Sequence, residues 1–174
     1  MNEIAPIRFC PLCGNKVEER EAFGAIRPVC PACSYIHFQD PKVAAGVLVQ
    51  SEGKVLLVRR INVPMQGKWT LPAGFVDGQE DPRSTAVREC LEETGLEVEI
   101  VDLVDVLYGL EHQRGASIVI FYRGRIVGGE LSAGDDADAV AFFDADNLPP
   151  LGFQATEQVL ARWVSERADS SDCG

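Results

Sequence analysis

The sequence predicts a mixed α/β sandwich, an α+β fold, with a small β unit in front of it. Short β-prone runs rich in cysteine and proline fill the first 40 residues, and longer alternating or apolar segments follow from Pro41. A chain of 174 residues, 46% of them hydrophobic, can build one ordinary domain plus a small appendage. We therefore predict two domains, at residues 1–40 and 41–167, and a flexible polar tail at 168–174.

The chain is acidic, with a formal net charge of -11. Nucleic acids and anionic membranes attract an excess of Lys and Arg, so we expect neither as a partner. A bound cation could still bridge an acidic site to a phosphate-bearing small molecule. The opening residues Met1 to Ile4 lack the basic and apolar regions of a signal peptide, and no apolar run approaches the roughly 18 residues of a membrane helix. We therefore expect a cytoplasmic protein.

Two Cys-x-x-Cys pairs mark the first unit. Cys10 and Cys13 are separated by sixteen residues from Cys30 and Cys33, and a hairpin between them would bring the four thiolates together. Tetrahedral Zn²⁺ fits such a set, and four cysteines leave no open coordination position, so the zinc would be structural. A redox dithiol or two disulfides are the alternatives, and the absence of an export signal favours metal ligation.

The second unit opens with a predicted hairpin. Its strands span residues 43–50 and 54–60, and Ser51-Glu52-Gly53 supplies a turn with glycine where a positive φ is needed. A helix is predicted at about 82–94 because Asp81 can cap its start, with Pro82 at the first helical position, and Gly95 can end it in a left-handed conformation. The other predicted elements are strands at 97–107, 116–122, 123–130 and 140–144, and a helix at about 156–167.

The predicted helix at 82–94 carries an acidic face. Glu89, Glu92 and Glu93 fall within an arc of roughly 100°. Close carboxylates repel one another unless cations neutralise them, so Arg88 could pair with Glu92 across one turn and Mg²⁺ suits the remaining oxygens. A solvated acidic face is the alternative. The opposite side of the helix is predicted to pack into the core through Val87, Cys90, Leu91 and Thr94.

The spacing around this helix resembles the Nudix box, Gly-x5-Glu-x7-Arg-Glu-U-x-Glu-Glu-x-Gly-U with U apolar. Gly74 is followed after five residues by Glu80, and seven more lead to Arg88 and Glu89. Cys90 to Leu96 completes the pattern, with cysteine where a bulkier aliphatic residue is usual. Every fixed position is present. The resemblance covers roughly residues 41 to 165.

This resemblance implies a Nudix fold, an α/β/α sandwich with a mixed sheet, and metal-dependent hydrolysis of a nucleoside diphosphate derivative. Carried over by position, Glu89, Glu92 and Glu93 would ligate Mg²⁺ or Mn²⁺, with the Gly74 carbonyl as a further ligand. The metal would neutralise the diphosphate, activate a water and stabilise the leaving phosphate. The residues that would brace the loop and the helix are Glu80, Arg88 and Gly95.

The general base has several candidates. Family members often use an acid on a downstream loop, and here an acidic loop, Gly134 to Asp138, precedes the strand predicted at 140–144. Asp136 or Asp138 could supply the base, as could Glu89. A solvated acidic loop is the alternative for the aspartates.

The first unit, with its two cysteine pairs, narrows the range of expected substrates. A zinc ribbon before a Nudix domain resembles NADH pyrophosphatases and a smaller group related to ADP-ribose or FAD pyrophosphatases. The chain length favours the second group, and the Ser-Gln-Pro-Trp-Pro-Phe-Pro signature of the first is missing from residues 98–117. We therefore expect ADP-ribose or FAD, cleaved to AMP and a second phosphate. The alternatives are NADH or RNA-cap hydrolysis, and a non-catalytic ligand sensor with the ribbon as a docking module.

Several side chains are candidates for substrate contacts. Arg59 and Arg60 could bind phosphate, unless they are ordinary surface charges. Phe38, Tyr35 and Tyr108 could stack on an adenine or flavin ring, although single aromatic residues more often belong to a core. The segment from Tyr35 to Phe38 could alternatively build a homodimer interface.

Overall fold

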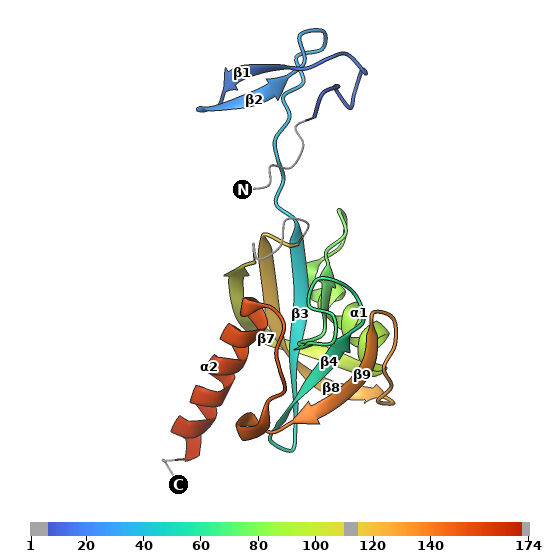
Figure 1. Cartoon of the computed structure of the whole chain (residues 1–174), viewed down its shortest axis with the longest axis vertical. Helices are drawn as coiled ribbons and strands as arrows, with labels where there is room; N and C mark the ends of the chain where they lie inside the picture. Colours follow the sequence, from blue (N-terminus) through green and yellow to red (C-terminus); the bar gives the residue numbers. More distant parts are fainter. Residues whose placement is uncertain (1–6, 110–114, 172–174) are drawn as a thin grey trace. The chain divides into compact units, whose positions relative to one another are not determined.

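Figure 1 shows the computed structural model of the chain, which describes residues 7–109 and 115–171. The chain divides into two compact units, and the division falls between Pro41 and Lys42, one residue after the predicted boundary. Within the described ranges, no helix is long and apolar enough to cross a membrane.

The first unit contains an antiparallel hairpin between the two cysteine pairs. Strand β1 (Glu18–Ala22) pairs with β2 (Ala25–Val29) along their whole length. Phe23 and Gly24 form the turn, both with positive φ, which matches the two left-handed residues of a tight hairpin turn. This hairpin returns the chain to where it began, as the cysteine spacing requires.

The second unit is built on a mixed sheet. Within the described residues, seven strands take part, in the order β5-β4-β3-β8-β7, with β6 on β3 and β9 on β4. The β3/β8 pair is parallel and the other pairs are antiparallel. The strands are β3 (Val43–Ser51), β4 (Lys54–Arg60), β5 (Trp69–Thr70), β6 (Ala73–Phe75), β7 (Leu96–Tyr108), β8 (Ile118–Gly129) and β9 (Ala137–Phe143).

Helices cover both faces of this sheet (Figure 1). Alternate residues of β3 point to opposite faces, so Val47 packs in one buried cluster with Cys90 of α1 (Pro82–Thr94). Leu48 packs in a second cluster with Trp163 of α2 (Gln154–Ser171). The predicted α/β sandwich with a mixed sheet is confirmed. A short 3-10 helix, η1 (Ala145–Asn147), precedes α2.

The ends of α1 are as predicted. The Asp81 side chain accepts a hydrogen bond from the backbone N–H of Arg83 at 2.8 Å, and Pro82 occupies the first turn. Gly95 has φ of 71°, and its N–H donates to the Leu91 carbonyl. These caps fix where the helix begins and ends relative to the sheet.

Three predicted boundaries are wrong. The strands predicted at 116–122 and 123–130 form one strand, β8, because no turn residue separates Tyr122 from Arg123. Strand β9 begins at Ala137, three residues before its predicted start. Helix α2 continues to Ser171 through part of the predicted tail, because no glycine or proline stops it at Arg167; residues 172–174 lie outside the described residues.

A comparison of two glycines distinguishes the effect of backbone strain from that of steric overlap when a side chain is added. Gly95 and Gly67 both have positive φ, 71° and 75°. A Cβ on Gly95 would overlap the Glu130 carbonyl oxygen, whereas a Cβ on Gly67 would meet nothing within 4 Å.

We expect Gly67→Ala to lower the free energy of unfolding by about 1 kcal/mol and Gly95→Ala by roughly 2 to 4 kcal/mol. Urea unfolding followed by tryptophan fluorescence measures both, since both tryptophans lie in the second unit. Equal losses would contradict the steric reason.

Candidate active site

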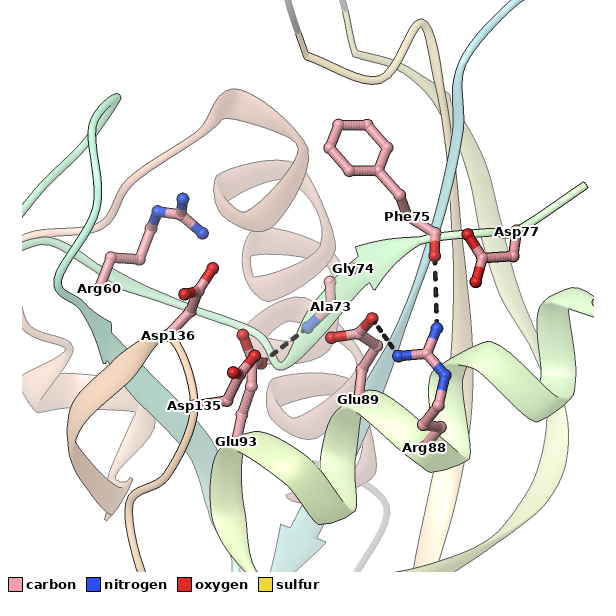
Figure 2. Close-up of a pocket in the computed structure, with 10 residues that line it drawn as sticks. All are labelled: Arg60, Ala73, Gly74, Phe75, Asp77, Arg88, Glu89, Glu93, Asp135 and Asp136. Atoms are coloured by element: carbon pink, nitrogen blue, oxygen red, sulfur yellow. Dashed lines mark hydrogen bonds and ion pairs between the residues drawn. The ribbon is translucent and has the colours of Figure 1, made fainter.

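Helix α1, strand β6, the end of β4 and the β8–β9 loop enclose a pocket of about 350 Å³ (Figure 2). Arg60 lies at one end of the pocket and Arg88 at the other, with acidic side chains between them. The lining residues are Arg60, Ala73, Gly74, Phe75, Asp77, Arg88, Glu89, Glu93, Asp135 and Asp136.

Glu93 is the most deeply buried acid of this pocket. Only 4% of the residue is exposed, and its carboxylate accepts a hydrogen bond from the backbone N–H of Ala73 at 3.1 Å. Burial raises the pKa of Glu93 to about 8, because a charge loses its hydration there. The predicted core face of α1 is wrong at one position, since Leu91 is 47% exposed while Glu93 turns inward toward β6.

Glu89 depends on a glycine beside it. A Cβ on Gly74 would overlap the Glu89 carboxylate, so the carboxylate lies where any other residue would place a side chain. The Glu89 side chain is 12% exposed, and burial raises its pKa. Because Gly74 has no side chain, the Glu89 carboxylate can lie against the β6 backbone.

Arg88 binds three carboxylates at once. Its Nε and Nη2 donate to the two oxygens of Glu80, both at 2.9 Å, and this pairing lowers the pKa of Glu80 to about 2. Its Nη1 donates to Glu89 at 2.7 Å and to Glu92 at 2.9 Å. The predicted ion pair between Arg88 and Glu92 is therefore present. Glu92 itself has a side chain 44% exposed and does not line the pocket.

Of the two aspartates predicted as the general base, only one lines the pocket. Asp136 lines it together with Asp135. Asp138 does not, because β9 already includes it and its carboxylate accepts from Arg59 Nε at 2.7 Å. That hydrogen bond lowers the pKa of Asp138. The expectation of a loop at this position, which supported Asp138 as a base, is wrong.

The two neighbouring arginines of β4 also have different places. Successive side chains of a strand point to opposite faces, so Arg60 lines the pocket and Arg59 does not. Arg59 is bound to Asp138 instead. The alternation along β4 separates the two arginines, and the start of β9 supplies the partner of Arg59.

The predicted stacking residues are divided between the two units. Phe38 belongs to the first unit, where its ring is 5.8 Å from that of Phe23 and 4.6 Å from the Arg27 guanidinium. Tyr35 lies in the same unit, half-buried, and its carbonyl accepts from Cys30 N–H. Tyr108, at the end of β7, is 74% exposed and does not line the pocket.

Four lining residues were not predicted as site residues, and the first of them is Ala73, whose backbone N–H donates to Glu93. Phe75 and Asp77 occupy variable positions of the box pattern, where no residue type is prescribed, so the pattern gives no signal for them. Asp135 stood in the acidic loop, and its φ of 46°, in the left-handed region, could not be read from the sequence.

The four cysteines of the first unit converge. Their sulfurs all lie within 4.8 Å of one another, and the shorter separations are 3.5 to 3.6 Å. Tetrahedral zinc at a Zn–S distance of 2.3 Å places its sulfurs about 3.8 Å apart. The set is therefore compatible with a metal ion, and these cysteines are free thiols rather than disulfides.

The two cysteine pairs are repeats of one local structure. The N–H of residue 14 bonds to the Cys10 carbonyl and the N–H of residue 34 to the Cys30 carbonyl, both at 2.9 Å. Gly14 and Ser34 each have positive φ, so the tight turn recurs even though one of the two is not glycine. The side-chain amide of Asn15 donates to Cys13 Sγ and lowers the pKa of that thiol to about 6, whereas the neighbouring Cys13 sulfur helps to raise the pKa of Cys33 to about 12.

The chain matches the NUDIX domain family over residues 40–164. The chain belongs to the Nudix family. It is a Nudix hydrolase, and its fold and box carboxylates agree with that membership.

Three relatives indicate the range of this family. The crystal structure of a NUDIX hydrolase from Nitrosomonas europaea is 36% identical with a TM-score of 0.83, covering 94% of this chain and 93% of that one. The ADP-ribose pyrophosphatase of Methanocaldococcus jannaschii is 41% identical over 120 residues, 68% of this chain and 69% of its own. The NAD-capped RNA hydrolase NudC of Pseudomonas aeruginosa is 28% identical over 169 residues, 95% of this chain, which spans only 58% of the length of that protein.

Nudix enzymes use divalent metal ions, and the pocket of this Nudix chain fits a hard cation. Five carboxylates line it against two arginines, one of which is already bound to acids. Two of the carboxylates, Glu89 and Glu93, are buried enough that their pKa values rise. Oxygen donors that are crowded and partly dehydrated are stabilised by Mg²⁺ or Mn²⁺.

Burial of Glu93 predicts a pH-dependent penalty when no Mg²⁺ or Mn²⁺ is added. Its pKa of about 8 exceeds the value near 4.5 of an unfolded glutamate, so between these pH values the folded state retains a proton that the unfolded state has released. The free energy of unfolding therefore falls as pH rises through this window. Glu93→Gln keeps an acceptor for Ala73 N–H but cannot ionise.

We therefore expect Glu93→Gln to be more stable than the wild type by roughly 2 kcal/mol or more at pH 8, with the difference vanishing near pH 4.5. Urea unfolding at both pH values, without added divalent ions, measures this. A stability difference that does not change with pH would contradict the burial of an ionisable group at this position.

Proposed function

We propose that this Nudix hydrolase cleaves the diphosphate bond of ADP-ribose or FAD, giving AMP and a second phosphate. One observation carries the proposal: Glu89 and Glu93 share a pocket with Arg60 and Asp136, so groups for a cation, a phosphate and a proton lie together. The 41% identity to an ADP-ribose pyrophosphatase supports ADP-ribose as the first substrate to test.

The residues proposed to hold Mg²⁺ or Mn²⁺ are Glu89, Glu92 and Glu93, with the Gly74 carbonyl. The bound ion would neutralise the diphosphate, lower the pKa of a water and stabilise the leaving phosphate. Arg88 holds Glu89 and Glu92 through the same Nη1 nitrogen, which fixes their positions relative to each other. Glu80 in turn fixes Arg88 through two hydrogen bonds.

Arg60 and Asp136 would complete the reaction from the other end of the pocket. Arg60 would bind a phosphate of the substrate, because a guanidinium matches phosphate oxygens with paired N–H donors. Asp136 would accept the proton of the attacking water as general base. Its carboxylate is oriented by a 2.6 Å hydrogen bond from the side-chain amide of Asn62.

The substrate is tested by incubating the full chain with Mg²⁺ or Mn²⁺ and each of five substrates: ADP-ribose, FAD, NADH, NAD-capped RNA and a nucleoside triphosphate. We expect turnover of ADP-ribose or FAD to yield AMP, and Glu89→Gln or Glu93→Gln to lower kcat by about 10²- to 10³-fold. Glu157→Gln, on the exposed side of α2, is the matched control and should retain activity.

A specific observation favours NAD-capped RNA as a second candidate, since the NudC relative aligns with 95% of this chain, the cysteine unit included. Preferred cleavage of that substrate would replace ADP-ribose and FAD. No turnover of any substrate, with the metal bound, would contradict the enzymatic proposal and favour a ligand sensor.

The two aspartates of the β8–β9 region distinguish a base from a structural ion pair. Asp136→Asn should lower kcat by about 10²- to 10⁴-fold, because a general base contributes that much. Asp138→Asn should change kcat by less than about 3-fold, since Asp138 is bound to Arg59 outside the pocket. Steady-state kinetics on ADP-ribose measure both, and the reverse order of effects would assign the base to Asp138.

We further propose that Cys10, Cys13, Cys30 and Cys33 bind one structural Zn²⁺. Protein purified without chelator should contain about one zinc per chain by elemental analysis, as one four-cysteine site requires. Cys33→Ser should lose most of this zinc, whereas Cys90→Ser should retain it, because Cys90 is buried in the second unit. Wild-type protein without zinc would contradict the assignment.

A further inference from the structure

Arg60 is the arginine of the pocket that is not committed to a carboxylate. Arg88 binds three acids, and Arg59 binds Asp138 outside the pocket. Within the described residues, Arg60 makes no ion pair of 4 Å or less, and its one side-chain hydrogen bond is from Nε to the Pro64 carbonyl at 3.3 Å. Its two terminal nitrogens thus remain available toward the pocket that it lines (Figure 2).

The guanidinium of Arg60 also contacts an aromatic ring. Its central carbon lies 5.1 Å from the centre of the Phe153 ring, within the range of a cation–π contact. The Phe153 ring therefore contacts the guanidinium at its central carbon, and the Pro64 carbonyl accepts the Nε hydrogen bond. The terminal N–H groups, which lie in the guanidinium plane, are left to bind a ligand.

The backbone that supports Phe153 is strained. Its φ is 67°, in the left-handed region, which is unfavourable for a non-glycine residue. Such strain persists only where surrounding contacts fix the backbone, and it often marks functional sites. The strain here sets the direction in which the aromatic ring leaves the chain.

Contacts on both sides fix this arrangement. The N–H of Gly152 donates to the Trp69 carbonyl at 2.8 Å, and a Cβ on Gly152 would come within 3.0 Å of the Cβ atoms of Lys68 and Met65. The Arg60 backbone makes two hydrogen bonds to the same loop: its N–H donates to the Lys68 carbonyl, and its carbonyl accepts from the Gly67 N–H. The ring and the guanidinium are therefore held by the same stretch of chain.

We propose that Phe153 is a positioning residue that holds Arg60 for binding one phosphate of the substrate diphosphate. This inference rests on the phosphate-binding role proposed for Arg60. It adds a residue from the segment before α2, distant in sequence from the box. Arginine is suited to this double contact because its guanidinium can contact an aromatic ring while its terminal donors bind phosphate in pairs. A lysine ammonium is not planar and has no such paired donors.

The test uses methylenediphosphonate, a diphosphate analogue whose P–C–P bridge resists hydrolysis, with Mg²⁺ and the full chain. Its Kd is measured by calorimetry for the wild type and for Phe153→Leu and Phe153→Tyr, each alone and combined with Arg60→Gln. Leucine keeps an apolar side chain on the same left-handed backbone but removes the ring, and tyrosine retains the ring. Urea unfolding and the KM and kcat for ADP-ribose are measured on the same variants.

We expect Phe153→Leu to raise the Kd by about 3- to 10-fold and Phe153→Tyr to stay within about 2-fold of wild type. In the Arg60→Gln background, Phe153→Leu should have no further effect, because a positioning residue acts only through the group it holds. With ADP-ribose, the change should appear in KM more than in kcat.

Three outcomes would overturn the inference: an unchanged Kd for Phe153→Leu, the same loss with and without Arg60, or a normal Kd for Arg60→Gln. The last would also remove the phosphate-binding role of Arg60. The predicted Kd pattern without turnover of ADP-ribose or FAD would refute the proposed substrate while supporting the role of Phe153, since the analogue contains no nucleoside.

Discussion

The Arg88 guanidinium gathers Glu80, Glu89 and Glu92 around one positive charge, and the rest of the pocket is arranged around that contact. Without it, the carboxylates of the helix would repel one another and turn toward water. Glu80 belongs to the loop and Glu89 to the helix, so Arg88 also joins the two segments whose relative position shapes the pocket. The same contact gives a physical reason for the spacing of Glu80, Arg88, Glu89 and Glu92 in this chain.

Glu93 is held by a different force from its neighbours. Its carboxylate has no arginine within an ion-pair distance among the described residues, and the backbone N–H of Ala73 is its hydrogen-bond donor. Packing of Cys90 and Ala86 against β3 fixes the helix and brings Glu93 inward with it. The stability lost by burying this acid is a consequence of placing a dehydrated oxygen donor where a cation would be bound most strongly.

The sequence was most informative where a residue acts locally. Asp81, Pro82 and Gly95 determine the ends of α1 through their own backbone and side-chain chemistry, so the helix could be predicted to the residue. Arg59 and Asp138 could not be placed, because their outcome depends on where β9 starts against β4. Because β9 begins three residues earlier than predicted, residues expected in a loop belong to a strand. Their side chains then point alternately to the two faces of the sheet.

The chain offers two sets of candidate metal ligands that differ in chemistry. Four thiols converge in the first unit, whereas the pocket of the second unit presents carboxylates and backbone oxygen. Thiolates prefer zinc and hard oxygens prefer magnesium or manganese, so under the proposed roles each set would select its own ion from a common solution.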